Sequence, residues 1–399
     1  MTAPPAQMAG GAVCSAYGND LIASVDHPVS GSGARIHVTT LLRMTTEAAL
    51  RGYLLEEALA WLLRRGGYEL LLDESDDPVD LRWSGQGLTV RGRGADHPAD
   101  MLGELAFVAP LSLPVRLFVE ARFRSAVTGL PEVRNAHGVV ADVNDSVGSA
   151  SGTGRAHRRH RYAYALFSTS GFSSGAQHYA LAHEISLVDL SGPAFEWLRA
   201  PVQRAAAAVV ELASHVKQEF PSAHPLPQAV LRHHVRLALE MTDRQPPATG
   251  GDAVWDPVGE YVTEIAWRMR QRLARGGDDE LLLGFPPAPF PLALTARRPG
   301  GTDAFVAYAR RNPTHPVWLL HKGGRRAVSW EVVPADGSEA YRLCFNLPGH
   351  LDSWLAGSDQ GRAGDDDPLS SMLIHRVSKQ GTEVFRLQYS PRQRDRTRP

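Results

Sequence analysis

Apolar residues follow a helical period in one stretch near the start of the chain. Leucines and alanines recur three and four residues apart from Leu50 to Leu62, and Thr45-Thr46-Glu47 just before them has the composition of a helix start. The pattern predicts a helix that begins near Glu47. Glu56 lies beside the apolar stripe of this helix, where a surface residue in a capping network is the simplest interpretation.

A second pattern marks strands. Leu117-Phe118-Val119 is an apolar run too short for a helix and follows Pro114, so it predicts a buried strand. Two further short strands are predicted at Tyr68–Leu72 and Leu88–Arg91. The acidic segment Asp73–Asp80 between them reads as a solvated turn, and we assign it no chemistry.

The second half of the chain changes from helical to strand-like patterns. Residues 193–243 are helical in pattern, and short strand-like runs dominate from Ala304 to Tyr389. An Ala-, Pro- and Gly-rich start and a basic tail predict disorder at both ends. The predicted divisions are a disordered start (1–20), an α/β domain (21–200), a helical connection (201–243), a Pro- and Gly-rich linker (244–254), a smaller β-rich or α+β domain of unknown role (255–390) and a disordered tail (391–399).

Charged residues stand at the end of the predicted strand that contains Leu117-Phe118-Val119. Side chains alternate between the two faces of a strand, so Glu120 and Arg122 share one face. If the segment that ends at Asp100 pairs with this strand as a hairpin, Asp100 comes to lie beside them. Two carboxylates and a cation at a sheet edge suit a divalent metal and a phosphate, because Mg²⁺ is typically held by one or two protein carboxylates together with substrate phosphate and water.

Three further stretches occur in order around these residues: Gly52–Tyr68, Gly94–Asp100 and Ala165–Leu190. Together with the Glu-x-Arg strand end, they resemble the PD-(D/E)xK nuclease superfamily, and within it the Mrr-like restriction endonuclease group. The first is similar to the opening helix of the group, with Glu56 at its acidic position. The second resembles Gly-x-Asp-Gly-Gly-x-Asp, with His97-Pro98 in place of two glycines. The third is similar to the late strand, Thr-rich turn, helix and final strand of the group.

The resemblance covers roughly residues 47–200, about two fifths of the chain. It implies an α/β fold in which a restriction-endonuclease-like mixed sheet is flanked by helices. It also implies a Mg²⁺ or Mn²⁺ cofactor, with catalytic and supporting residues around the ion. The metal ligands would be Asp100, Glu120 and the backbone carbonyl of Ala121, with Glu56 as a further catalytic residue and Asp96 in support.

Arg122 stands where the group has lysine. Arginine stays protonated near neutral pH, so it cannot serve as a base. It can still place positive charge near a phosphate in the transition state. Three of the 42 basic residues of the chain are lysines, and this arginine-rich usage favours a Lys-to-Arg exchange. An exchange at a catalytic position also fits an inactive copy of the nuclease.

The charge balance restricts where a nucleic acid could bind. The formal net charge is −1 over 399 residues, so any basic surface must be local. A short basic cluster occurs after a Gly/Ser-rich run and consists of Arg155, Arg158, Arg159 and Arg161, with His157 and His160 among them. This loop is either a solvated connection or a set of phosphate contacts beside the active edge.

Cysteine content and hydropathy bound the remaining classes of protein. Two cysteines are too few for a disulfide framework or a Cys-based zinc site. The sequence has neither the basic and apolar regions of a signal peptide nor an apolar run long enough to cross a bilayer. We therefore expect a bacterial cytoplasmic protein without a membrane partner.

The sequence leads to one function and leaves two others open. The leading hypothesis is a metal-dependent DNA endonuclease in restriction or phage defence, with DNA as partner. One alternative is a catalytically inactive nuclease fold that acts as a nucleic-acid-binding or sensor subunit of a defence complex, alongside a protein partner. The other is that residues 255–390 carry the main activity. A homodimer is a further option, because nucleases that cut both strands commonly pair.

Overall fold

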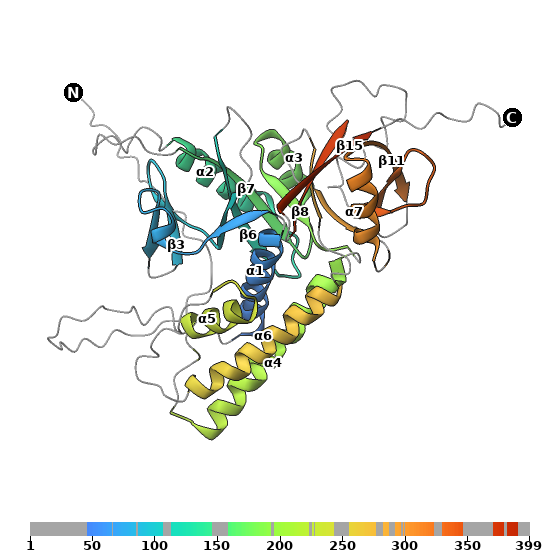
Figure 1. Ribbon diagram of the computed structural model, residues 1–399. Coiled ribbons are helices and arrows are strands. Elements are labelled where there is room, and N and C mark those ends of the chain that lie inside the picture. The colour runs from blue at the N-terminus through green and yellow to red at the C-terminus, as the bar shows by residue number, and fades with distance from the viewer. Residues whose placement is uncertain are drawn as a thin grey trace, which may run out of the picture. The chain divides into compact units, whose positions relative to one another are not determined.

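A computed structural model of the chain gives the architecture shown in Figure 1. The residues that it describes are 46–65, 67–84, 87–106, 113–145, 159–192, 195–222, 226, 228–242, 255–276, 282–286, 292–296, 298, 300–322, 329–345, 370–378 and 381–389. The predicted disordered ends, the linker 244–254 and most of the basic loop lie outside these residues. Seven α-helices and several sheets occur in the described part, which makes the chain a mixed α/β protein.

Helix α1 (Glu47–Arg65) forms where the leucine period predicts it. The Thr46 hydroxyl accepts a hydrogen bond from the backbone N–H of Ala49 (3.3 Å), which caps one of the free amides of the first turn. Most of the helix is buried. Gly67 follows with a φ of 99°, a left-handed conformation that suits glycine, and turns the chain into the first strand.

A mixed sheet of five strands forms the centre of this part of the chain. The strands are β1 (Tyr68–Leu71), β5 (Met101–Leu105), β6 (Val115–Arg122), β7 (Arg161–Ser168) and β8 (Ser186–Asp189), in the spatial order β1-β5-β6-β7-β8. The first two pairings, β1 with β5 and β5 with β6, are antiparallel. The last two are parallel, so β6, β7 and β8 end at the same edge of the sheet.

Helices cover both faces of this sheet, and the residues of β6 show why. Leu117, Val119 and Ala121 pack in the core that contains α1. Phe118 points the other way, into a core that includes Val133 of α2 (Leu130–Asp145) and residues of α3 (Ser174–Ala182). This alternation follows from strand geometry, and it places Glu120 and Arg122 on the same side as Phe118.

A smaller antiparallel sheet is inserted between β1 and β5. It consists of β2 (Leu81–Ser84), β3 (Gly87–Arg91) and β4 (Asp96–Pro98), preceded by a short 3₁₀ turn, η2 (Glu74–Asp76). The sequence pattern predicts β3 but not β2 or β4. Trp83 of β2 is 52 % exposed. The apolar residues of β2 are therefore not all buried on one face, as they are in an ordinary strand.

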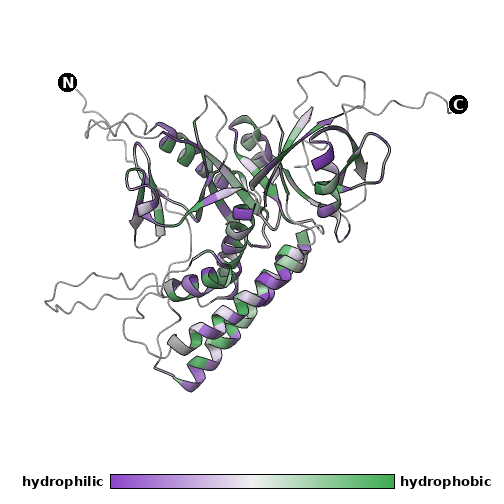
Figure 2. Cartoon of the chain, viewed as in Figure 1, coloured by the Kyte–Doolittle hydropathy of each residue, from purple (hydrophilic) through white to green (hydrophobic). Residues whose placement is uncertain are grey.

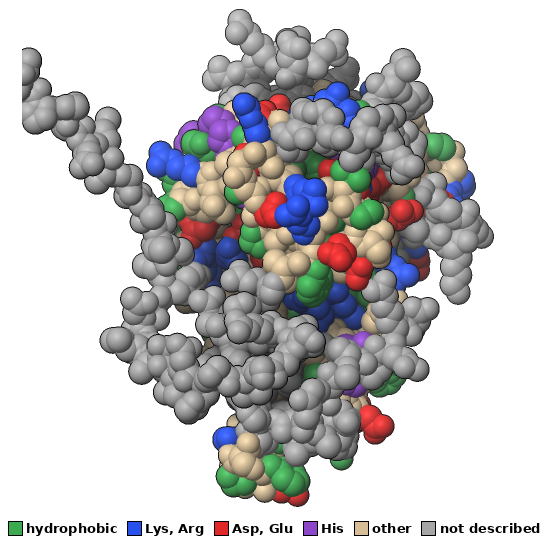
Figure 3. All heavy atoms as spheres, turned by 90° about the vertical axis from the view of Figure 1, so that its left-hand side faces the viewer, with side chains coloured by type: hydrophobic (Ala, Val, Ile, Leu, Met, Phe, Trp, Pro, Cys, Tyr) green, Lys and Arg blue, Asp and Glu red, His purple; other side chains and the backbone are tan. Residues whose placement is uncertain are grey.

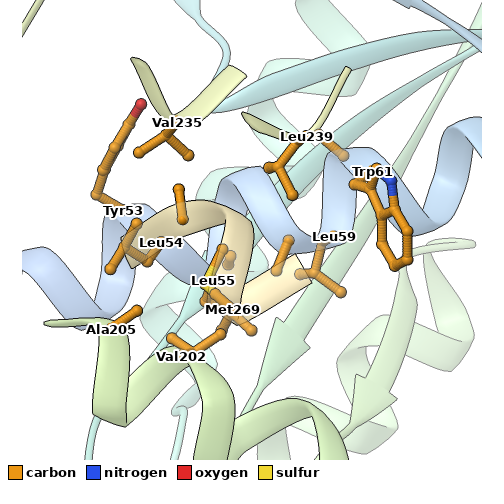
Figure 4. Packing of buried hydrophobic residues seen from close by; sticks show 14 of the residues in the cluster. Tyr53, Leu54, Leu55, Leu59, Trp61, Val202, Ala205, Val235, Leu239 and Met269 are labelled. Carbon is orange, nitrogen blue, oxygen red and sulfur yellow. The ribbon is translucent and has the colours of Figure 1, made fainter. Parts of the chain in front are cut away.

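Three further helices, α4 (Glu196–Glu219), α5 (Gln228–Ala238) and α6 (Trp255–Gly276), pack on the outer face of α1. Figure 4 shows Leu54, Leu55 and Leu59 of α1 among side chains from these helices, which include Val202, Ala205, Val235 and Met269. One continuous core therefore spans the predicted boundary at residue 200. The apolar face of α1 is shared by the sheet and by the helices that follow it.

The last part of the chain forms a closed barrel of seven strands with one helix. The barrel order is β10-β13-β12-β11-β15-β14-β9, and its core contains Phe305, Leu343, Phe345 and Ile374. The pairing of β11 with β15 is parallel, and the others are antiparallel. The elements are β9 (Leu282–Phe285), β10 (Leu292–Ala296), α7 (Gly301–Arg311), β11 (Thr314–Lys322), β12 (Ser329–Pro334), β13 (Leu343–Phe345), β14 (Ser371–Ser378) and β15 (Gly381–Tyr389). This part of the chain is β-rich from residue 282 onward, whereas α6, which lies inside the predicted range 255–390, packs in the core of α1 instead.

Hydropathy along the ribbon follows these elements. In Figure 2 the long helices α4 and α6 carry alternating green and purple bands, as expected for helices with one packed and one solvated face. None of the helices in the described ranges combines the length and the apolar character that a membrane crossing requires.

Candidate active site

The carboxyl end of β6 carries the charged group that the sequence singles out. Met101 of β5 pairs with Val119 of β6 in an antiparallel register, so Asp100, which directly precedes Met101, lies at the same end of the strand pair as Glu120. The backbone N–H of Ala121 donates a hydrogen bond to the Asp100 carboxylate. The expected hairpin is therefore present, and it brings Asp100 and Glu120 together beside Arg122.

Arg122 lies against both carboxylates. Its guanidinium contacts the Glu120 carboxylate, and its Nη1 is 3.9 Å from Oδ2 of Asp100. The Glu120 side chain is only 7 % exposed, whereas the Arg122 and Asp100 side chains are 34 % and 38 % exposed. Glu120 is thus held at the inner end of the group, and the other two side chains are partly exposed and partly buried.

Tyr164 fixes the second oxygen of Glu120. This residue lies on β7, opposite Phe118 in the parallel register, and its hydroxyl donates a hydrogen bond of 2.6 Å to Oε2 of Glu120. Burial raises the pKa of Tyr164 above its usual value, so the phenol stays protonated and remains a donor. The two oxygens of Glu120 therefore have different partners, a guanidinium and a phenol.

The carboxyl group of Glu56 on α1 interacts electrostatically with the Asp100 carboxyl group. Burial raises the pKa of the Glu56 carboxyl well above its usual range, and the charges of Asp100 and Glu57 raise it further. Burial also raises the pKa of Asp100, although Arg122 and the Ala121 amide act in the opposite direction. Carboxylates that share a site repel one another in this way. A divalent cation among them would relieve the repulsion, although Glu56, Asp100 and Glu120 do not form a group of three ligands within 4.8 Å of one another in the described part of the chain.

Asp96 does not join this group. It lies on β4, in the small sheet, where its carboxylate is 3.5 Å from Nη1 of Arg82, and both side chains are largely exposed. No interaction of Asp96 with Asp100 or Glu120 occurs among the described residues. A supporting role for Asp96 stays a prediction without a geometric basis.

The described part of the basic loop leads into the start of β7. Arg161 begins β7 and pairs with Val115, whereas Arg122 pairs with Ser168 at the other end of the same strand pair. At about 3.3 Å per residue, Arg161 and Arg122 are roughly 20 Å apart. Arg161 forms an exposed ion pair with Glu184 (3.0 Å), and Arg159 is exposed. Arg155, Arg158 and His157 lie outside the described residues. The interpretation of this loop as a set of phosphate contacts stays a prediction, and of its described residues Arg161 lies at the end of the β6–β7 pair remote from Arg122.

Tyr164 and Arg232 lie near the site but belong to no sequence motif. Tyr164 belongs to the alternating run Arg161–Leu166, and strand alternation puts it on the face of Glu120 once the pairing of β6 and β7 is known. Arg232 of α5 lowers the pKa of both Glu56 and Asp100 through its charge. Nothing local in the sequence indicates Arg232, since α5 lies far from β6 along the chain.

A second charged cluster occupies the opposite end of β6. Arg116 is 3 % exposed, and its guanidinium lies 2.8 Å from Oδ2 of Asp77 and 3.1 Å from Oε2 of Glu104. His160 is also buried, with Nε2 3.3 Å from Glu104 and Nδ1 3.7 Å from Asp80. The acidic turn that we assigned no chemistry supplies two members of this cluster.

Asp77, Asp80 and His160 could hold a metal ion, because their ligand atoms lie within 4.8 Å of one another. Arg116 already provides a positive charge to both carboxylates, at 2.8 Å from Asp77 and 3.5 Å from Asp80. A buried ion-pair network therefore accounts for this cluster without a metal. In contrast to Arg116 in this cluster, Arg122 in the Asp100–Glu120 group is partly exposed to solvent.

Comparisons with known proteins identify no family for the chain. No family model matches it, and no curated protein matches it. Among solved structures, the crystal structure of the protein of unknown function AF1548 aligns with 57 % of this chain and 96 % of its own length, at 16 % identity and a TM-score of 0.27. A likeness at this level carries no argument about function. The site itself must carry the proposal.

Proposed function

We propose that this chain is a metal-dependent DNA endonuclease with a restriction-endonuclease-like fold, which hydrolyses phosphodiester bonds in restriction or phage defence in the cytoplasm. One observation carries the proposal: Asp100, just before β5, and Glu120 of β6 lie at the same end of this strand pair, with the guanidinium of Arg122 against both. A pair of acidic residues and a cation at the end of two adjacent strands is a suitable arrangement for a divalent ion and a phosphate.

The residues of the chain divide the work as follows. Asp100, Glu120 and the backbone of Ala121 would hold Mg²⁺ or Mn²⁺, and Tyr164 keeps Glu120 in place through its hydrogen bond. When bound, the ion lowers the pKa of water and stabilises charge on the phosphate. Arg122 has a partly exposed side chain, so its guanidinium can contact the phosphate and stabilise negative charge as it develops.

Glu56 has a different part in this proposal. Its raised pKa makes the carboxyl hold a proton at higher pH than an ordinary glutamate. A cation beside it favours the ionised form and releases this proton. In this proposal Glu56 therefore supports the site as a carboxyl whose ionisation a bound cation would favour.

A second candidate function rests on the same ion pair. Arg122 contacts Glu120, so a guanidinium occupies the carboxylate that would have to bind the metal ion. If metal cannot compete with this guanidinium, the fold is a nuclease that has lost its chemistry and serves as a nucleic-acid-binding or sensor subunit. The exposed charges suit neither candidate better, because acidic and basic side chains are interspersed on the face shown in Figure 3.

The deciding experiment is incubation of the purified protein with supercoiled plasmid in Mg²⁺, in Mn²⁺ and in EDTA. The endonuclease proposal expects nicked or linear product with either metal and none in EDTA. Glu120→Gln is the matched control, since it keeps the shape of the side chain and removes its charge. Binding of plasmid without cleavage in either metal would favour the second candidate.

A further inference from the structure

Trp83 leaves about half of its surface open to solvent at the border of a buried core. On β2 it pairs with Leu88 of β3, and paired side chains of an antiparallel sheet share one face. Leu88 and Leu81, which lies two residues before Trp83, are both buried in this core. Trp83 belongs to the same face but is 52 % exposed. This exposure suits an indole that has one ring face against the protein and the other open.

The register of the small sheet places Trp83 near the candidate active site. Trp83 pairs with Leu88, and the carbonyl of Leu88 accepts a hydrogen bond of 3.0 Å from the backbone N–H of Ala99. The three residues therefore form one row across neighbouring segments. At about 4.8 Å per step, the backbone of Trp83 is roughly 10 Å from that of Ala99. Asp100 is the next residue along the chain, so an exposed aromatic ring lies near the carboxylates of the site.

Trp83 and Glu120 border the same core. Phe118 of β6 is buried in one cluster with Leu81 and Leu88 of the small sheet. Glu120 follows Phe118 by two residues and lies on the same face of β6. The indole and the Glu120 carboxylate are therefore on the same side of the main sheet, where one bound molecule can contact both.

The exposed apolar area around Trp83 is small. Val79 and Trp83 are the large apolar side chains with exposed surfaces among the described residues between 67 and 106. The neighbouring Arg82 and Asp96 are charged, with side chains that are 53 % and 43 % exposed. A stable protein interface buries about 800 Å² on each partner, far more than these two side chains offer. One open ring face is sufficient for a nucleobase, because every base can stack on an aromatic side chain.

We propose that Trp83 stacks on an unpaired base of the DNA strand held at the Asp100–Glu120 site, so that the substrate is DNA with unpaired nucleotides beside the cut. This inference rests on the proposed endonuclease function and deepens it, because it names the class of substrate. In the interior of a duplex the neighbouring bases cover both faces of each base. The indole can therefore stack only where a strand is single or a base is displaced from the helix.

The test compares Trp83→Ala and Trp83→Phe with the wild type. Trp267→Ala is the matched control, because Trp267 on α6 is 49 % exposed and lies outside the small sheet. Fluorescence anisotropy in Ca²⁺, over a series of salt concentrations, measures the binding of a labelled single-stranded oligonucleotide and of the same sequence as a duplex. The single strand is also measured with an abasic nucleotide at each position in turn, and thermal melting checks the fold of each variant.

The expected loss is confined to the single strand. Trp83→Ala should bind it about tenfold more weakly than wild type, as for one lost stack of a base on an aromatic ring. The salt slope should not change, because no charge is removed. Trp83→Phe should fall between the two, and Trp267→Ala should match wild type. An abasic nucleotide at one position should weaken binding by wild type but not by Trp83→Ala, since both changes remove the same stack.

Two results would overturn the inference. One is equal single-strand affinity in Trp83→Ala and wild type. The other is an equal loss on single strand and duplex with a lowered melting temperature, which would make Trp83 a packing residue. A wild-type protein that binds single strands through Trp83 but cuts no DNA in Mg²⁺ or Mn²⁺ removes the endonuclease proposal and supports the stacking role. A wild-type protein that cuts plasmid but binds no single strand removes this inference alone.

Discussion

Arg122 and Glu120 form an ion pair on one face of β6, two residues apart, at the strand end where Asp100 also lies. The pair gives the site a built-in cation in the place where the proposed function needs a metal ion. In the proposed function, metal binding must therefore move the Arg122 guanidinium away from the carboxylates, which its exposure of about a third allows. Cleavage would then depend on whether Arg122 or the metal ion holds Glu120.

The first prediction concerns Arg122 itself. Arg122→Lys should keep or raise metal-dependent nicking of plasmid, because lysine supplies a compact positive charge at the same place. Arg122→Ala should lose roughly a hundredfold in rate, as expected when one stabiliser of transition-state charge is removed. Initial rates across a Mg²⁺ titration measure both. Equal rates for Arg122→Ala and wild type would exclude any electrostatic role of Arg122 in cleavage.

The second prediction concerns the metal ligand. Glu120→Ala should abolish cleavage and weaken Mn²⁺ binding, since the site loses its innermost charged ligand. Tyr164→Phe removes only the hydrogen bond to Glu120, so it should lower the rate at saturating metal while Mn²⁺ still binds. Calorimetric titration with Mn²⁺ separates the two variants. Undiminished Mn²⁺ binding by Glu120→Ala would place the metal elsewhere.

The third prediction follows from the raised pKa of Glu56. The folded protein without metal holds the proton of this carboxyl to higher pH than the unfolded chain does. The free energy of unfolding should therefore fall as pH rises from the usual value of 4.5 through the raised folded pKa. Glu56→Gln should flatten this fall and be the more stable protein at neutral pH. Urea denaturation in EDTA across the pH range tests this, and an unchanged profile in the variant would contradict it.

The fourth prediction concerns the basic loop. Neutralising Arg155, Arg158, Arg159 and Arg161 together should weaken DNA binding and reduce its dependence on salt. Because Arg161 begins β7 at the end remote from Arg122, the cleavage rate at saturating DNA should not change. Single-turnover kinetics distinguish the two quantities. A lower rate at saturation would mean that the loop reaches the scissile phosphate after all, and unchanged affinity with an unchanged salt slope would make it a solvated connection.

The fifth prediction concerns the buried cluster around Arg116. Arg116→Met leaves Asp77 and Glu104 without their guanidinium, and it should lower the free energy of unfolding by about 3–5 kcal/mol. Arg161→Met is the control, because its ion pair with Glu184 is exposed and is worth about 1 kcal/mol or less. If a metal rather than Arg116 held this cluster together, chelator alone would destabilise the wild type and Arg116→Met would have little effect.

The sequence was sufficient for the elements with a strong period and for the residues within one hairpin. The leucine period predicted α1, and strand alternation with the hairpin hypothesis predicted that Asp100 would meet Glu120 and Arg122. Those contacts depend on local geometry, which a period of two or 3.6 residues encodes directly. Of the small sheet, the sequence pattern predicts β3 but not β2 or β4. The exposed Trp83 interrupts the expected alternation in β2, and the acidic turn before it has no strand pattern.

The remaining parts of the site depend on contacts between distant segments. Arg232 contacts Glu57 and the Tyr53 ring of α1 only because α5 packs on α1, and no local pattern encodes this packing. His160 meets Asp80 and Glu104 through the parallel pairing of β6 with β7. The same pairing places Arg161, the last residue of the basic cluster, at the strand end remote from Arg122. Parallel pairing and helix packing are tertiary choices, and sequence periodicity does not specify them.

The shared face of α1 limits how the chain can be divided. Leu54, Leu55 and Leu59 are at most 1 % exposed and touch helices that follow residue 200 (Figure 4). A fragment that ends at that point would present these leucines to water, at a cost of about 1.5–3 kcal/mol for each side chain. We expect residues 46–200 alone to aggregate and residues 46–276 to stay monodisperse in light scattering. An ancestral chain without the barrel would therefore have kept α4, α5 and α6 together with the sheet, because they share one core.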